Sequence, residues 1–396
     1  MEQYDQWQQL LPMVEPFYAV KSNPDPVILR LLSALGCGFD CATQGEIDLV
    51  LSGLGNDLNF ADKPNSTDKM VYANPQKMKS HVEFAAQNGV CRTVFDGEDE
   101  LYKLASVNDK LPEGRKLELL LRMSTDDEKS VCSFSHKFGC PAQEAPELLK
   151  IAQELNLNVV GVSFHVGSGC GDEGAYKKAF NDAYYVFEAA EQLGMPKMSM
   201  VDIGGGFPGD NLGSYREDAP TFPKIAKTVA AAITDFESKF FNQERKFRYI
   251  AEPGRYFCAR STTIASKVYG RKGGRGKNQA LYIDNGVYGS FNNVVYDHFN
   301  PVPIKLQTAL KGEEDLDSDE MIPTAIFGPT CDGLDQICDQ KTTQMPRAEV
   351  DDWLLFENMG AYTHTASFVF NGYTHIPQYI HCINTTDYES EDSNGL

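Results

Sequence analysis

The chain has 396 residues, of which 42% are hydrophobic, and this length is sufficient for two sizeable cores. Its 36 basic and 56 acidic residues give a net charge of −20, which argues against nucleic acid or an anionic membrane surface as a partner. No apolar run reaches the roughly 18 residues that a membrane-spanning helix requires.

The ten cysteines include no CxxC pair and no Cys/His run with metal-ligand spacing. The polar N-terminus, MEQYDQWQQ, does not resemble a signal peptide. We therefore expect reduced thiols, no metal site and a cytoplasmic location.

Apolar, strand-like runs alternate with amphipathic stretches in the first two thirds of the chain. The runs are residues 16–21, 37–42, 70–75, 92–97, 116–123, 158–168, 198–206 and 246–255. Helical stretches include Pro26–Leu35, Gly45–Ser52, Lys77–Asn88, Pro146–Leu155, Ala175–Leu193 and Pro223–Phe240. Eight strands alternating with helices predict an α/β fold, a (β/α)8 TIM-like barrel over residues 1–260.

Polar residues stand at or near the C-terminal ends of seven of these runs: Lys21, Asp40, Asn74, Arg122, His165, Gly204–Gly206 and Glu252. A parallel barrel gathers the carboxyl ends of its strands on one face, where barrel enzymes place their active sites. The pattern therefore predicts a site on that face.

The sequence pattern changes after Arg260, where the alternation of strand-like and helical stretches ends. Residues 270–278 form a basic, Gly-rich stretch that we expect to be a hairpin loop, because it lacks the GK[ST] of a phosphate loop. Residues 311–320 read as an acidic loop, and short β-rich runs surround it. An antiparallel β-sandwich or Greek-key domain is predicted over 261–396, with a frayed acidic tail, TTDYESEDSNGL.

Lys21 ends the apolar run PFYAVK, so it either surfaces there or serves as a lysine that forms a Schiff base with an aldehyde cofactor. In VDIGGGFPG, Gly204–Gly206 suit an anion, with dinucleotide binding and a tight packing turn as alternatives. His165 in SFHVGSG is either a satisfied strand residue or a ring that stacks on a planar cofactor, with Ser168 as a phosphate donor.

AEPGR places Glu252, Gly254 and Arg255 beside the glycine loop of a closed barrel. An arginine and a glycine N–H suit a phosphate and a carboxylate suits a protonated ring nitrogen, while a Glu252–Arg255 salt bridge is the alternative. In GPTCDGLD, Cys331 is by default a structural thiol. Asp332 and Asp297, the latter in YDH, would attract a cationic substrate end if they share a pocket.

Eight motifs in order, PFYAVKSN, GFDCAT, VGVSFHVGSG, VDIGGGFPG, AEPGRYF, YDH, GPTCDGLD and ENMGAYT, resemble the eukaryotic-type ornithine decarboxylase family from about Leu10 to Tyr373. These are pyridoxal-phosphate enzymes with an alanine-racemase-like barrel. The resemblance implies decarboxylation of L-ornithine to putrescine and CO2, a step of polyamine biosynthesis.

The resemblance also implies residue roles. Lys21 would carry the cofactor as a Schiff base, Glu252 would keep the pyridine nitrogen protonated, and His165 would stack on the ring. Ser168, Gly206, Gly254, Arg255 and Tyr362 would bind the phosphate, with Gly204 and Gly205 in the same loop, and Asp40, Glu46, Arg122 and Lys137 would support the site. Cys331 would return a proton to the substrate's Cα, and Asp297, Asp332 and Tyr296 would bind its distal end.

In this family the site lies at a homodimer interface, so Cys331 would complete the partner's site and Lys137 would pair with Asp335 of the partner subunit. The segment matching the antizyme-binding region, about Ala86–Lys110, is acidic, which argues against antizyme binding. Family members usually begin with an extra strand, whereas only a short polar stretch precedes Pro16 here, so we expect either that this strand is missing or that the chain is truncated.

Three alternatives stay open on sequence grounds. A sister decarboxylase would act on lysine, arginine or diaminopimelate, and one methylene in a substrate is worth only about 1–3 kcal/mol. A racemase on the same barrel is disfavoured by Glu252, because racemases of this class place an arginine at the pyridine nitrogen. A catalytically inactive, antizyme-inhibitor-like homologue is disfavoured because the residues expected to bind the cofactor are present.

Overall fold

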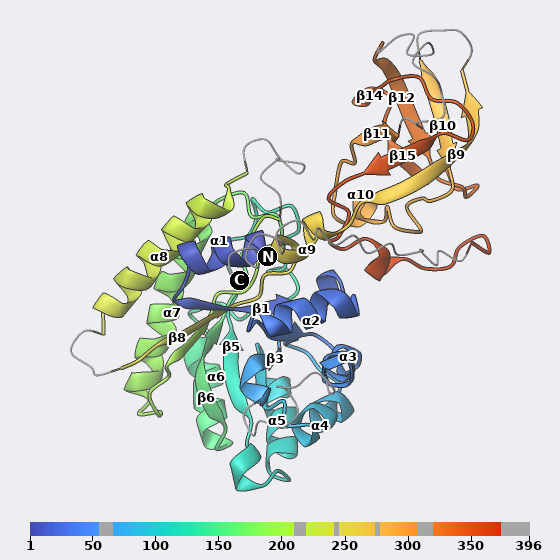
Figure 1. The fold of residues 1–396 in the computed structure, drawn as a ribbon. Helices are drawn as coiled ribbons and strands as arrows, with labels where there is room; N and C mark the ends of the chain where they lie inside the picture. Colours follow the sequence, from blue (N-terminus) through green and yellow to red (C-terminus); the bar gives the residue numbers. More distant parts are fainter. Residues whose placement is uncertain (55–65, 210–218, 241–244, 274–277, 307–319, 374–396) are drawn as a thin grey trace, which may run out of the picture.

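A computed structural model of the chain describes residues 1–54, 66–209, 219–240, 245–273, 278–306 and 320–373. They form two parts, a barrel in blue to yellow-green and a sheet in orange to red (Figure 1). The expected acidic tail, nearly all of the acidic loop and the middle of the basic loop lie outside the described residues.

Eight parallel strands close into the predicted barrel, because β1 pairs with both β2 and β8. The strands are β1 Val14–Ala19, β2 Gly38–Cys41, β3 Met70–Tyr72, β4 Arg92–Phe95, β5 Glu118–Arg122, β6 Asn158–Ser163, β7 Met200–Asp202 and β8 Arg248–Ala251. Each falls within or beside one of the eight predicted runs, so the barrel is confirmed.

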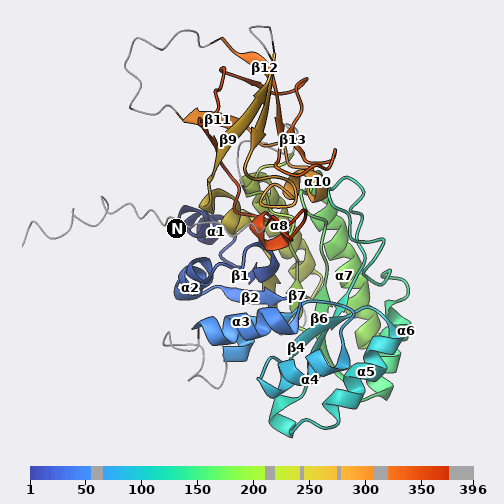
Figure 2. The same cartoon turned by 90° about the vertical axis from the view of Figure 1, so that its right-hand side faces the viewer.

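One helix lies in each connection between successive barrel strands and covers the outside of the barrel (Figure 2). These helices are α2 Pro26–Ala34, α3 Gln44–Leu54, α4 Lys79–Gln87, α5 Glu98–Asn108, α6 Ala145–Glu154, α7 Gly174–Gln192 and α8 Phe222–Ser238, and the short α9 Arg255–Cys258 follows β8. The pattern predicted α2, α3, α4, α6, α7 and α8, whose apolar positions recur at helical spacing, whereas α5 was not among the predicted stretches.

The short polar stretch at the N-terminus forms a helix, α1 Glu2–Leu10, which the sequence analysis did not predict. Its anchor is Trp7, which is fully buried and stacks on Phe222 with ring centroids 5.4 Å apart. The Trp7 indole also donates a hydrogen bond to the Val14 carbonyl at 2.9 Å. One aromatic residue, rather than an apolar stripe, fixes this helix against the barrel.

Alternate residues of the strands face inward and outward, as the two-residue period requires. The interior holds a separate buried cluster: Phe17, Val71, Val94, Leu120, Met200 and Ile250. Tyr18 and Tyr72, each next in sequence to an interior residue, pack in the layer between barrel and helices instead. The interior is therefore a packed core, and chemistry is restricted to the barrel's ends.

The second part is a seven-stranded sheet, counted over the described residues, with the order β11-β15-β9-β10-β12-β13 and β14 paired to β12. Its elements are β9 Ile264–Lys272, β10 Gln279–Ile283, α10 Asn293–Tyr296, β11 Pro303–Leu306, β12 Ile322–Phe327, β13 Gln336–Cys338, β14 Gln344–Met345 and β15 Trp353–Phe356. The predicted β domain and the hairpin pairing of β9 with β10 are confirmed. One pair differs from the antiparallel expectation: β10 and β12 run parallel, because α10 and β11 intervene and return the chain to the same end of the sheet.

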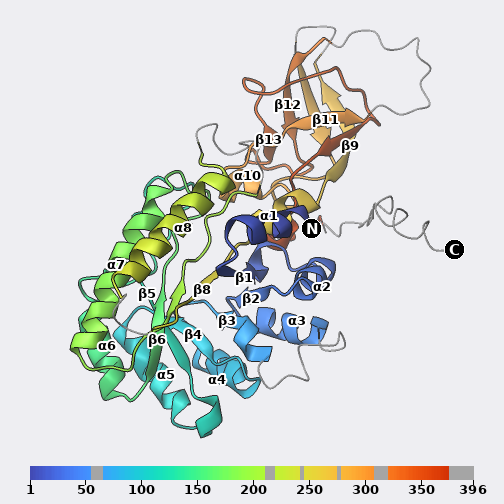
Figure 3. The ribbon, with the colours of Figure 1, turned by 60° about the vertical axis from the view of Figure 1, so that its left-hand side comes forward.

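The last barrel strand ends at Ala251 and the sheet begins at Ile264, and we propose a domain boundary near residue 260. Helix α10 lies where the sheet domain meets the barrel (Figure 3). No helix in the described ranges is long and apolar enough to cross a bilayer. The nine described cysteines are free thiols.

Candidate active site

The carboxyl ends of the barrel strands bring together six of the predicted positions. Lys21 lies in a 3-10 turn, Val20–Ser22, directly after β1, and Asp40 lies in β2. Arg122 ends β5, and His165, Gly204–Gly206 and Glu252 follow β6, β7 and β8. Barrel closure puts β8 beside β1, so Glu252 reaches the same end as Lys21.

An ion pair joins the first two of these residues. The Lys21 Nζ atom lies 3.6 Å from Asp40 Oδ2, and the Asp40 carboxylate raises the pKa of Lys21. Asp40 is buried, and burial raises its own pKa while Lys21 opposes that shift. The Lys21 side chain is 43% exposed, so its amine is accessible to a ligand.

Glu252 is buried next to a second carboxyl group that sequence reasoning missed. Burial raises the pKa of Glu252 well above its ordinary value, and Asp202 adds to the shift. Asp202 accepts hydrogen bonds from the Gly204 N–H at 2.9 Å and from the Ser163 hydroxyl at 3.2 Å, and burial raises its pKa to about 6. The signal was present, because Asp202 stands two residues before the first glycine of VDIGGGFPG.

His165 is held as a neutral ring. Its Nδ1 accepts a hydrogen bond from the Gly167 N–H at 2.9 Å, which places the proton of the neutral ring on Nε2. Burial lowers the pKa of His165 well below its ordinary value, and the cations Arg122 and Lys21 lower it further. A Cβ on Gly205 would lie 2.7 Å from this Nε2. Glycine is thus required for the loop to approach the imidazole.

A cluster suited to an anion adjoins this ring. Arg255 Nη2 lies 3.4 Å from Ser168 Oγ, and its guanidinium lies 4.9 Å from the centre of the Tyr362 ring. A Cβ on Gly254 would lie 3.2 Å from the Tyr362 hydroxyl. Gly206 has φ +103°, a conformation that other residues rarely adopt. Serine and tyrosine hydroxyls, an arginine and glycine backbone together suit a phosphate.

Asp297, from the C-terminal end of α10, closes this cluster from the second domain. Its Oδ2 lies 2.5 Å from Arg255 Nη2, and both side chains are less than 10% exposed. Its other oxygen lies 3.7 Å from the Cys132 thiol, whose pKa is raised to about 11 by burial and by Asp297. Sequence reasoning missed Cys132, and no pattern around it indicated a role. Tyr296, next to Asp297, is exposed.

The CDGLD loop lies apart, within the second domain. Cys331 is exposed, and its Sγ lies 3.3 Å from Asn371 Oδ1. Asp332 accepts a hydrogen bond from the Tyr288 hydroxyl, which raises the pKa of Tyr288 to about 12. These contacts join Cys331 and Asp332 to their own domain and not to Lys21.

Asp335 and Lys137 were expected to pair between subunits. Asp335 is 1% exposed and is saturated by its own chain: it accepts from the Val287 N–H at 2.9 Å and from the Thr330 N–H and hydroxyl at 3.0 and 2.6 Å. Lys137 lies over the Phe138 ring at 4.8 Å. The intersubunit pair stays a prediction, and Asp335 has a structural role that the sequence did not reveal.

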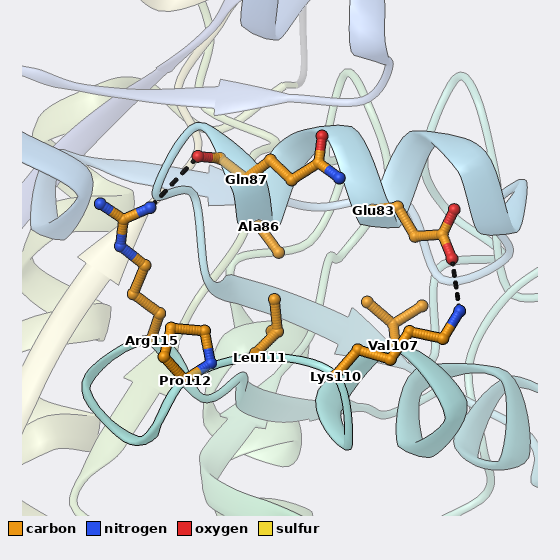
Figure 4. A pocket seen from close by; sticks show the side chains of 8 residues that line it. All are labelled: Glu83, Ala86, Gln87, Val107, Lys110, Leu111, Pro112 and Arg115. Carbon is orange, nitrogen blue, oxygen red and sulfur yellow. Dashed lines mark hydrogen bonds and ion pairs between the residues drawn. The ribbon is translucent and has the colours of Figure 1, made fainter.

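A separate pocket of about 410 Å³ lies between α4 and the segment after α5 (Figure 4). Lys110 pairs with Glu83 at 3.3 Å on one side, and Arg115 donates to the Gln87 carbonyl on the other. These segments lead into the amino ends of β4 and β5. The pocket is therefore at the end of the barrel opposite Lys21.

The residues at the Lys21 end fit pyridoxal phosphate. Glu252 Oε1 is buried without a hydrogen-bond partner in the described chain, so it can accept a hydrogen bond from a donor such as a protonated ring nitrogen. The flat imidazole of His165 and the anion cluster around Arg255 suit a planar ring and a phosphate. Over the same described ranges, no group of three or more His, Cys, Asp or Glu residues is arranged to hold a metal ion.

Known proteins resemble this chain in sequence and in fold. Residues 1–259 match the family model described as "Pyridoxal-dependent decarboxylase, pyridoxal binding domain". The chain is 39% identical to an ornithine decarboxylase of Caenorhabditis elegans over 96% of this chain and 85% of that protein, and 41% identical to antizyme inhibitor 2 of Xenopus laevis over 93% and 75%. The crystal structure of the Paramecium bursaria Chlorella virus arginine decarboxylase superposes with a TM-score of 0.80 at 30% identity, covering 94% of this chain and 90% of that one.

The lysine/ornithine decarboxylase of Vibrio vulnificus, solved with cadaverine, superposes with a TM-score of 0.77 at 30% identity, over 94% of this chain and 89% of that one. The sequence matches and the fold matches are consistent across these comparisons. The chain belongs to the pyridoxal-dependent decarboxylase family that includes the ornithine decarboxylases, and its cofactor is pyridoxal phosphate.

Proposed function

We propose that this protein converts L-ornithine to putrescine and CO2. The observation that carries the proposal is that Lys21, Glu252 and His165 meet at one end of the barrel beside an anion cluster that a second-domain carboxylate, Asp297, closes. Ornithine decarboxylases at about 40% identity over nearly the whole chain support the substrate.

The cofactor would be held at both ends. Arg255, the Ser168 hydroxyl, the Tyr362 hydroxyl and the glycine backbones at 204–206 and 254 would bind the phosphate, and neutral His165 would lie against the ring. Bound there, pyridoxal phosphate supplies an aldehyde that condenses with amines and a ring that delocalises the electron pair left when CO2 departs.

Side chains of the protein would hold the cofactor in place and transfer the protons of the reaction. Lys21 would provide the amine that receives and releases the cofactor, with Asp40 orienting its ammonium. Glu252 would hold a proton on the ring nitrogen, because its buried oxygen has no other donor in the described structure. The Cys331 thiol would return the proton to the substrate's Cα.

Recognition of the distal ammonium would fall to carboxylates. Asp297, with Tyr296 next to it, would bind it together with Asp332 of the partner subunit, because two carboxylates in one pocket would attract a cation. Lysine and arginine decarboxylases among the structural neighbours make longer substrates the competing choice. The difference of one methylene is small enough to require measurement.

We propose that the site is completed by a second copy of the chain. Cys331 is exposed on a surface where Leu334, Phe368 and Val369 are exposed apolar side chains. Phe368 contacts Tyr288, which in turn binds Asp332, so the apolar surface and the proposed catalytic loop are continuous. Burial of such a surface against a partner's barrel would bring Cys331 to the partner's Lys21.

Product analysis tests the substrate. Purified protein with pyridoxal phosphate is offered ornithine, lysine, arginine or diaminopimelate, and amines are separated and quantified. Putrescine from ornithine at the highest kcat/KM is expected, with no product from Lys21→Ala. Lys69→Ala is the matched control, since Lys69 is similarly exposed (40%) and pairs with Glu15 at the opposite end of the barrel. Preferential turnover of another amino acid would overturn the choice of ornithine.

Mixing inactive variants tests the shared site. Lys21→Ala and Cys331→Ala chains are combined in equal amounts, and random pairing gives half mixed dimers, each with one intact site, hence about a quarter of wild-type activity. No recovery, with mixed dimers verified by mass, would contradict a shared site.

A second candidate function has a specific basis, the 41% identity to antizyme inhibitor 2. In that case the protein would act by binding antizyme, and the acidic Ala86–Lys110 segment would be the surface at which this binding is tested. Absence of any amine product from protein that shows a bound cofactor, together with capture of purified antizyme, would favour this candidate.

A further inference from the structure

At the junction of the two domains, Arg255 contacts both the cluster suited to a phosphate and a carboxylate. Arg255 Nη2 lies 3.4 Å from Ser168 Oγ, in the cluster suited to a phosphate, and the same nitrogen lies 2.5 Å from Asp297 Oδ2. Both side chains of the ion pair are nearly inaccessible to water, so solvent does little to screen them.

A phosphate arriving beside Arg255 would bring a charge of nearly −2 next to the Asp297 carboxylate. The two anions would then compete for one guanidinium, and their mutual repulsion would be strong in this buried place. A cation bound to Asp297 would relieve that repulsion and leave Arg255 to the phosphate.

We propose that the Arg255–Asp297 ion pair couples cofactor to substrate: the phosphate and the distal ammonium of a diamine bind cooperatively, because each takes one partner of the pair. The identity of the amine in this inference rests on the proposed function. The competition between the phosphate and Asp297 for Arg255 does not depend on it. Asp297 thereby acts on cofactor affinity as well as on substrate binding. Linkage requires the effect to be reciprocal, so phosphate should tighten diamine binding by the same factor.

Binding measurements on the full-length protein stripped of cofactor test the coupling. Pyridoxine 5′-phosphate is the probe, because it lacks the aldehyde and forms no Schiff base with Lys21 or with an amine. Its Kd is measured by calorimetry with and without saturating putrescine. In the wild type, putrescine is expected to lower the Kd about tenfold, within the usual range for two coupled sites.

Asp297→Asn separates the coupling from other causes. This variant is expected to bind pyridoxine 5′-phosphate several-fold more tightly without putrescine, and putrescine should have no further effect. Asp332→Asn is the matched control. The Asp332 carboxylate hydrogen-bonds Tyr288 rather than Arg255, so the variant should leave the Kd of the probe unchanged when no amine is present. Because Asp332 is proposed to bind the distal ammonium, the variant should weaken putrescine binding. Pyridoxine without phosphate should show no coupling.

The outcomes distinguish the two proposals. Equal probe affinity in the wild type and Asp297→Asn, with no effect of putrescine on either, would overturn the coupling even if ornithine is decarboxylated. Tighter probe binding by Asp297→Asn without any response of the wild type to putrescine would support the competition and contradict putrescine as the amine.

Discussion

The ammonium of Lys77 lies 2.9 Å from the Glu100 carboxylate, and neither side chain is exposed at all. Lys77 also donates to the carbonyls of Asn74 and Val94 at 2.8 and 2.6 Å, so it joins the loop after β3 to the end of β4. Burial lowers the pKa of Lys77 to about 8, an effect that Glu100 partly offsets.

Breaking this pair should cost stability. Lys77→Met would remove the ammonium that pairs with buried Glu100 and leave Lys103 as its cationic partner, and we expect a loss of about 3 kcal/mol in the free energy of unfolding. The measurement is urea denaturation followed by circular dichroism. Lys110→Met is the control, because the exposed Lys110–Glu83 pair should contribute under about 1 kcal/mol. Equal losses in both variants would refute the distinction.

Gly205→Ala should weaken the cofactor site while the barrel still folds. The added methyl group would meet the His165 ring at 2.7 Å and the Glu252 carbonyl at 3.0 Å, so the imidazole must shift. We expect the affinity for pyridoxal phosphate to fall at least about tenfold, as 1.4 kcal/mol of strain would cause, measured by absorbance titration. Gly53→Ala in α3 meets no atom within 4 Å and should preserve that affinity and raise stability by up to about 1 kcal/mol. Unchanged affinity in Gly205→Ala would mean that the loop tolerates the methyl group.

His165 should make stability depend on pH in acid. Because its pKa is lowered on folding, the unfolded chain binds the extra proton between the lowered value and about 6.5, so this contribution to stability is complete above that range and is lost as pH falls. Within that window, one such group changes the free energy of unfolding by about 1.4 kcal/mol per pH unit. Urea denaturation at pH 7.5, 6.5 and 5.5 should show a smaller slope in His165→Phe than in wild type, with a difference that grows toward one proton below about pH 6.5. Identical slopes would mean that folding does not lower the pKa of His165.

Asp335→Asn should destabilise the second domain. The amide would turn a donor toward one of the three donors that now bind the carboxylate, with an expected cost of about 2 kcal/mol for an unsatisfied buried group. Thermal unfolding checks this, with Asp284→Asn as the control, because exposed Asp284 accepts one bond, from the Lys267 N–H. A shift in the dimer dissociation constant without a loss of stability would instead favour the intersubunit pairing of Asp335 with Lys137.

Local sequence determined the barrel and the location of its site. Apolar runs such as PFYAVK, alternating with amphipathic stretches, specify strands and helices through their periods of 2 and 3.6, and parallel closure follows from their alternation. Because parallel strands share one carboxyl end, the place of Lys21 and Glu252 on one face needed no knowledge of their contacts. The helix at Glu2–Leu10 was not predicted, because its one buried residue, Trp7, gives no repeating apolar pattern.

Only the tertiary structure decided which charged groups meet. Arg255 and Asp297 are 42 positions apart and in different domains, and no local pattern indicated that they pair. Asp202 becomes a neighbour of Glu252 through the pairing of β7 with β8, and Asp335 becomes buried through the loops around Thr330 and Val287. Ion pairs and shared protons depend on separations of a few ångströms, and those are set by strand register and domain packing rather than by the spacing of residues along the chain.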